Sequence, residues 1–207
     1  MKICLKSLML LLIAVSLVWL SGCKNDDPKP ENIPELVTKL TLKFTPAGGG
    51  AAVAVTATDP DGEGVQDIKV DGPINLIKGT QYTLSLELIN GLYKIGEDGY
   101  NITAEVEEEG DEHQFFFRFS EGAFSSPTGT GNIKDNSSST DGSINYLDKD
   151  VNNLPIGIST SWTSSTVAAS DKSFRVLLKH QPDIKSGTST SLDGESDLDI
   201  SFVLNVN

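Results

Sequence analysis

The sequence predicts an all-β protein, an antiparallel β-sandwich of the immunoglobulin-like kind with about nine or ten strands. Two observations support this fold class. From residue 36 onward, apolar and polar residues alternate with a period of two over short segments, as they do in half-buried strands. Turn-forming runs rich in glycine, serine and aspartate separate these segments, and none of them combines helical periodicity with a helix-forming composition. A closed β-barrel is the alternative architecture.

The clearest alternation lies at the C-terminal end, where Leu198, Ile200 and Phe202 share one parity while Asp199 and Ser201 share the other. One face of such a strand packs inward and the other meets solvent. The predicted strands are 36–44, 52–58, 65–70, 80–89, 100–107, 112–119, 143–147, 156–162, 174–180 and 198–206.

The first residues carry the pattern of a secretory signal. Lys2 and Lys6 are basic, residues 8–20 are almost wholly apolar, and Leu20-Ser-Gly-Cys23 matches the lipobox of bacterial lipoproteins. Cleavage before Cys23 would leave this cysteine at the new N-terminus, where it receives lipid, including palmitate. We therefore expect a signal peptide at 1–22, a lipidated cysteine with a flexible, proline-rich tether at 23–35, and a single β-sandwich domain at 36–207.

The net charge and the cysteines limit which partners and which mode of membrane attachment the mature chain can have. The whole sequence has a formal net charge of −13, and loss of the two positive charges of Lys2 and Lys6 with the signal peptide leaves −15. This charge argues against nucleic acid as a partner and against adsorption on anionic headgroups, so the acyl chains of Cys23 must supply the membrane anchor. The other cysteine, Cys4, leaves with the signal peptide. The acidic run after Cys23 resembles the export signal of surface lipoproteins in some Gram-negative bacteria. This implies the outer membrane as the location. A protein that faces the cell surface fits this signal, and the periplasmic orientation stays open as the alternative.

The most unusual run is 104–119, where six acidic residues lead into one of only two histidines and then into four phenylalanines. Segments 100–107 and 112–119 are predicted to form a hairpin with this acidic cluster at its tip. His113 opens the second strand on its inward parity, and His180 closes the strand 174–180, also on the inward parity. In antiparallel neighbours these two positions lie at the same end of a sheet.

Two imidazoles beside carboxylates suit zinc or another divalent transition metal such as copper or iron. The candidate metal ligands are His113, His180, Glu109, Asp111 and Glu112. The structural alternative is that each histidine ends an apolar stripe and forms only local hydrogen bonds. Calcium is less favoured, because the aspartate-rich turns at 59–63 and 148–153 lack the EF-hand pattern and have the composition that tight turns need.

An enzyme is the least favoured class. The chain has no Gly-x-Ser-x-Gly motif and no phosphate-binding glycine loop before a helix, and lipidation would remove Cys23 as a nucleophile. Trp162 is the single tryptophan beyond the signal peptide, and it could serve as a platform for a sugar ring. Its inward parity at the end of strand 156–162 favours core packing.

Several stretches are similar to a group of uncharacterised Gram-negative surface lipoproteins. They are Cys23-Lys-Asn-Asp-Asp-Pro, Ala104-Glu-Val-Glu-Glu-Glu-Gly-Asp-Glu-His-Gln-Phe-Phe-Phe117, Ile156-Gly-Ile-Ser-Thr-Ser-Trp162 and Leu178-Lys-His-Gln-Pro182. Members of this group commonly occur beside TonB-dependent outer-membrane receptors, so the resemblance implies a role in nutrient or metal uptake.

The sequence therefore predicts a lipid-anchored, non-catalytic binding module that captures a metal ion or metal complex for a TonB-dependent uptake system. Two other functions stay open from the residues alone. One is a structural or interaction module that binds a partner protein, for example through the Ser-, Gly- and Asn-rich stretch 120–142. The other is a carbohydrate-binding module built around Trp162.

Overall fold

The computed structural model of the protein describes residues 35–62, 64, 66–134 and 143–207. The predicted signal peptide, Cys23 and all of the predicted tether except Glu35 lie outside the described residues. Within the described part, no helix has both the length and the apolar character that a membrane span requires.

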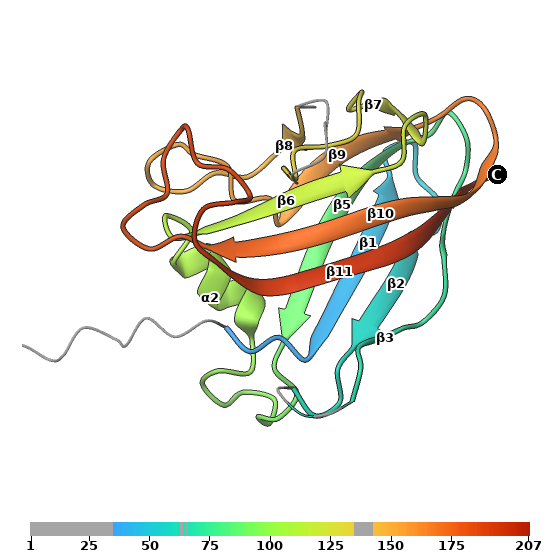
Figure 1. Cartoon of the computed structure of the whole chain (residues 1–207). Helices are drawn as coiled ribbons and strands as arrows, with labels where there is room; N and C mark the ends of the chain where they lie inside the picture. The colour runs from blue at the N-terminus through green and yellow to red at the C-terminus, as the bar shows by residue number, and fades with distance from the viewer. Residues whose placement is uncertain (1–34, 63, 65, 135–142) are drawn as a thin grey trace, which may run out of the picture. The chain divides into compact units, whose positions relative to one another are not determined.

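Among the described residues, two β-sheets pack face to face, and one short helix lies at one end of them (Figure 1). The described elements are β1 (Lys39–Pro46), β2 (Val53–Thr58), β3 (Lys69–Val70), β4 (Ile74–Leu76), β5 (Gln81–Ile89), α2 (Ile102–Glu108), β6 (His113–Phe119), β7 (Phe124–Ser126), β8 (Asn145–Tyr146), β9 (Ser159–Ser164), β10 (Ala169–His180) and β11 (Glu195–Val206).

One sheet has the strand order β3-β2-β1-β5-β9-β7, with β8 also paired to β9, and the other has the order β4-β11-β10-β6. Every pair is antiparallel except β11 with β4, which is parallel. The all-β sandwich that the alternation predicts is confirmed, and neither sheet closes into a barrel.

The core lies between the sheets, and the period-two alternation fills it. Leu40, Leu42 and Phe44 of β1 are fully buried while the residues between them are more exposed. β5 buries Leu84 and Leu88 in the same way. Burial of one parity from each strand is what holds the two sheets together.

Trp162 is at the centre of an aromatic cluster and is 0% exposed. Its ring centroid lies 4.7 Å from that of Phe124, 5.1 Å from Phe174 and 5.5 Å from Phe117. Its indole N–H donates to Thr160 Oγ1 at 2.7 Å, so its polar atom is satisfied inside the core. The ring therefore offers no face to a sugar, and the interpretation of Trp162 as a ligand-binding residue is corrected to core packing.

Replacing this ring should measure how much the cluster stabilises the fold. Trp162→Ala is expected to lower the free energy of unfolding by about 3–5 kcal/mol, because it leaves a large cavity among aromatic rings. Urea denaturation followed by far-UV circular dichroism measures the loss, with Trp162→Phe as the milder control. A loss below about 1 kcal/mol would contradict the central packing role of this residue.

The predicted hairpin is wrong in its first half, because residues 102–108 form the helix α2. Ile102 and Val106 are buried and lie four residues apart, a spacing that suits one helix face as well as one strand face. Asn101 caps the helix by accepting a hydrogen bond from Ala104 N–H at 3.3 Å. Thr103 Oγ1 bonds both the N–H and the carbonyl oxygen of Leu88, so the helix is fastened to β5.

The Ser-, Gly- and Asn-rich stretch 120–142 contains regular structure in its described part. Residues 124–126 form β7, and Ile133 lies over Phe116 and Leu177 on the outer face of the second sheet. The N–H of Phe117 donates to Asn132 Oδ1, and the carbonyl oxygen of Phe117 accepts the N–H of Asn132. This segment therefore covers the edge of β6. The remaining residues, 135–142, lie outside the described part of the chain.

Candidate metal-binding site

The two histidines meet at one end of the second sheet. β6 begins at His113 and β10 ends at His180, and the antiparallel register pairs these two residues directly. Their ring centroids are 4.6 Å apart and the ring planes differ by 2°, so the imidazoles stack. His113 is 0% and His180 is 4% exposed, as their inward parity predicts.

Asp197 joins them from the neighbouring strand through a β-bulge. Leu178 pairs with Leu198, but Lys179 pairs with Ser196, so Asp197 has no partner across the ladder. The extra residue of a bulge re-aims its side chain. The carboxylate of Asp197 is fully buried, and its Oδ2 lies 3.7 Å from His113 Nε2.

Glu35 comes from the segment that precedes β1 and completes the group. Its Oε2 accepts a hydrogen bond from His113 Nε2 at 2.8 Å, and its side chain is only 8% exposed. One ligand atom from each of Glu35, His113, His180 and Asp197 lies within 4.8 Å of every other. We call these four residues the His/carboxylate cluster.

Backbone contacts fix the orientation of His113. Its Nδ1 lies 3.1 Å from the carbonyl oxygen of Glu109, which can only accept, so Nδ1 carries a proton. Nε2 is therefore the nitrogen that faces the carboxylates. Lys185 Nζ donates to the carbonyl oxygens of His113 and Gly110 and lies 2.9 Å from Asp150 Oδ2, which holds the start of β6 in place.

The charges of the cluster shift its proton equilibria strongly. Burial raises the pKa of Asp197 to about 7, and the negative charge of Glu35 adds to this rise. Burial alone would lower the pKa of His113, but its hydrogen bond to Glu35 and the charge of that carboxylate raise it above the ordinary value. Burial opposes ionisation of Glu35, yet its hydrogen bond with His113 and the charge of that ring hold its pKa below the usual range.

Three buried polar atoms of the cluster make no hydrogen bond within the described residues. They are Nε2 of His180 and both carboxylate oxygens of Asp197. Their ion-pair contacts are longer than a hydrogen bond, at 3.6 Å from His180 Nε2 to Glu112 and 3.7 Å from Asp197 Oδ2 to His113 Nε2. A buried polar atom without a hydrogen bond costs about 1–3 kcal/mol, and such atoms are rare in native proteins. Their concentration beside His113 and Glu35 indicates a place where a cation would satisfy several of them together.

Comparisons with family models, with curated proteins and with solved structures found no match for this chain.

The structure brings together only part of the ligand set predicted from the sequence. Glu109 contributes its carbonyl oxygen to His113 rather than its carboxylate. Glu112 lies at the rim, with Oε2 3.6 Å from His180 Nε2 and a side chain that is 36% exposed. Asp111 is exposed in the turn after α2. Glu112 therefore still contacts a ring nitrogen from the rim, but the four ligand atoms that converge include the carboxylates of Glu35 and Asp197 instead of those of Glu109, Asp111 and Glu112.

The aspartate-rich turn before β9 has its own internal partners. Asp148 accepts the N–H groups of Gly157 and Ser159, and Asp150 Oδ1 accepts those of Asn152 and Leu154. These are the hydrogen bonds that aspartate makes in tight turns. The contacts therefore favour the turn interpretation of this run over a calcium site.

The cluster can hold a divalent transition metal. Two imidazole nitrogens and two carboxylate oxygens are a donor set that zinc accepts in tetrahedral geometry. Two ionised carboxylates also balance the charge of a divalent ion, which matters because an unbalanced charge is costly to bury. The second contact of His113, to the carbonyl oxygen of Glu109, is the kind of support that orients metal-binding histidines.

Proposed function

We propose that this protein captures a divalent transition-metal ion, zinc in the first instance, through Glu35, His113, His180 and Asp197. The observation that carries the proposal is that one ligand atom from each of these four residues lies within 4.8 Å of the others. In addition, His180 Nε2 and both carboxylate oxygens of Asp197 are buried and make no hydrogen bond within the described residues. A structural ion pair alone would use the hydrogen-bonding capacity of its members more fully.

The distances favour exchange of a proton for a metal ion. His113 Nε2 and Glu35 Oε2 are 2.8 Å apart, the length of a charge-assisted hydrogen bond. Ligands about 2.0–2.1 Å from a tetrahedral zinc ion lie about 3.3 Å from one another. A small outward movement of Glu35 and inward movement of the other ligands would therefore accommodate the ion, with release of the proton from His113.

The arrangement suits binding rather than catalysis. Four protein ligands fill a tetrahedral zinc site, whereas catalytic zinc sites keep one position open for water or substrate. The four side chains are also almost fully buried. We accordingly place the protein among non-catalytic binding modules that capture and hold a metal ion.

Attachment to the outer membrane through Cys23 remains part of the proposal, and supply of metal to a TonB-dependent receptor is the uptake role that would fit it. The lipobox at Leu20–Cys23 supports this setting. We expect the protein to incorporate labelled palmitate and to sediment with outer membranes, and Cys23→Ala to abolish both. Equal labelling of the Cys23→Ala protein would contradict the predicted anchor.

Calorimetric titration of the purified, metal-free protein with zinc tests the proposed function. We expect one ion per chain with a dissociation constant of about 1 μM or tighter, because binding to buried N and O ligands of this kind releases on the order of 10 kcal/mol. Calcium is the control ion and should not compete, since it prefers six to eight oxygen ligands. Absence of saturable zinc binding up to millimolar concentration would overturn the proposal.

A further inference from the structure

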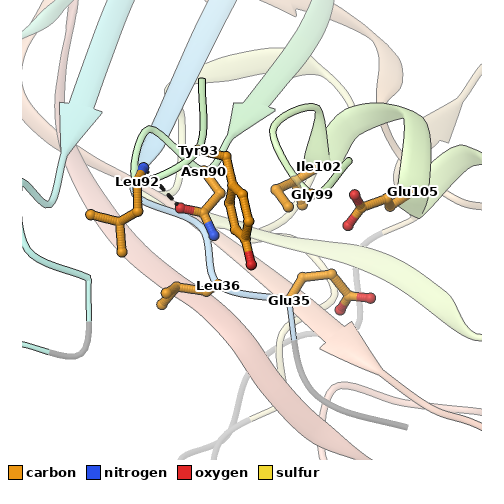
Figure 2. A pocket seen from close by; sticks show the side chains of 8 residues that line it. All are labelled: Glu35, Leu36, Asn90, Leu92, Tyr93, Gly99, Ile102 and Glu105. Carbon is orange, nitrogen blue, oxygen red and sulfur yellow. Dashed lines mark hydrogen bonds between the residues drawn. The ribbon is translucent and has the colours of Figure 1, made fainter. Parts of the chain in front are cut away.

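A pocket of about 390 Å³ opens beside Glu35, between the segment before β1, the loop after β5 and the helix α2 (Figure 2). Its volume is that of a site for a small organic molecule, far larger than a metal ion needs. The lining residues are Glu35, Leu36, Asn90, Leu92, Tyr93, Gly99, Ile102 and Glu105.

Asn90 presents a hydrogen-bond donor to this pocket. Its side-chain oxygen accepts the N–H of Leu92 at 3.1 Å, which fixes the orientation of the amide. The side-chain nitrogen then points into the pocket (Figure 2), and it donates to no residue in the described part of the chain. Asn90 is only 5% exposed, so this donor is a built feature that matches an acceptor such as a carbonyl oxygen.

The charged groups of the pocket are both acidic. Glu35 and Glu105 direct their carboxylates toward the same side of it (Figure 2), and the lining contains no lysine or arginine. Two carboxylates on one side of a pocket repel each other. A positive group between the two carboxylates would relieve this repulsion.

Apolar side chains form the remaining walls. Ile102 is 2% exposed and lies beneath the pocket on α2, while Leu92 and Tyr93 are 57% and 49% exposed at its mouth. An apolar ligand body would cover these two surface residues. The tyrosine ring also attracts a cation by its face.

We propose that this pocket binds a small organic cation with an apolar body, whose ammonium group lies at Glu35 and Glu105 and whose carbonyl oxygen accepts from Asn90. The pocket shares Glu35 with the His/carboxylate cluster, and its other lining residues lie outside that cluster. The inference does not rest on the proposed metal function, and it is tested with the metal removed.

Calorimetry in the presence of EDTA with three matched probes tests the inference. The probes are 6-aminohexanamide, which has the ammonium, the apolar chain and the carbonyl, hexanamide, which lacks the ammonium, and hexylamine, which lacks the carbonyl. We expect 6-aminohexanamide to bind at least about tenfold more tightly than either. Equal binding of 6-aminohexanamide and hexanamide, or no binding of 6-aminohexanamide, would overturn the proposal.

Two variants assign the contacts. Glu105→Gln should weaken 6-aminohexanamide binding at least about fivefold, whereas Glu107→Gln on the exposed side of α2 makes the same charge change outside the pocket and should leave binding unchanged. Asn90→Ser keeps an acceptor for the N–H of Leu92 but is too short to reach the ligand, so it should remove the advantage over hexylamine. Equal effects of the Glu105 and Glu107 variants would contradict the site.

Discussion

Zinc affinity is expected to fall about 100-fold or more in Asp197→Asn, because an amide oxygen carries no charge for the ion and leaves the buried site unbalanced. The same loss is expected for His113→Ala and His180→Ala, which each remove one ligand nitrogen. Asp197→Asn is the most informative of the three because the two side chains have nearly the same shape. Competition titration with a zinc-binding dye measures the zinc affinities of the three variants and of the unaltered protein on one scale.

Asp111→Asn is the matched control for this series. It makes the same chemical change in an exposed turn residue that the sequence, but not the structure, assigns to the site. Its zinc affinity should stay within about twofold of that of the unaltered protein, because exposed charges are screened by solvent. A loss in Asp111→Asn that equals the loss in Asp197→Asn would show that the acidic turn, rather than the His/carboxylate cluster, holds the ion.

The metal-free protein is expected to become less stable as the pH rises from about 5 to about 8, by a few kcal/mol. Asp197 has a folded pKa of about 7 against an ordinary value of 3.8, so between these values the folded state binds more protons than the unfolded state. Stability then falls with rising pH across that window. Urea denaturation at a series of pH values measures the slope.

The shifted pKa of His113 also makes stability fall as the pH rises, whereas the shifted pKa of Glu35 makes stability rise with pH. The folded pKa of His113 is raised, so its contribution is present below the ordinary histidine value and is lost as pH rises through the folded value. The folded pKa of Glu35 is lowered, so its contribution is lost only as the solution becomes acidic. Between pH 5 and 8 the raised pKa values of Asp197 and His113 therefore decide that stability falls as the pH rises.

Asp197→Asn should raise the stability of the metal-free protein at pH 8 by a few kcal/mol while it abolishes tight zinc binding. Saturating zinc should restore the stability of the unaltered protein at pH 8, by about 2.7 kcal/mol at one hundred times the dissociation constant. If Asp197→Asn destabilises the metal-free protein at pH 8, the buried carboxylate is a structural ion-pair partner and the proposed site loses its main support.

The sandwich was predictable from the sequence because a strand with one buried face has apolar residues at every second position, and this period-two alternation is visible in its strands. α2 was not, since Ile102, Ala104 and Val106 alternate like a strand although only the first and last are buried. The capping residue Asn101 was the signal for a helix, and the good helix formers after it agreed with that signal.

The histidines of the site could also be found from the sequence, since both stand at inward positions at strand ends. The carboxylates could not. Asp197 enters the site through a bulge that breaks the parity of β11, and no local pattern marks a bulge at that residue. Glu35 lies in the segment before the first strand, 78 residues from its hydrogen-bond partner His113. Only the folded chain brings such distant residues together.

A crystal structure of the protein grown with zinc, with anomalous diffraction recorded at the zinc edge, tests the central claim most directly. We predict one strong anomalous peak among Glu35, His113, His180 and Asp197, about 2.0–2.2 Å from the four ligand atoms. No peak at this position, or a peak bound only by the exposed acids around Asp111, would contradict the claim that the His/carboxylate cluster captures a metal ion.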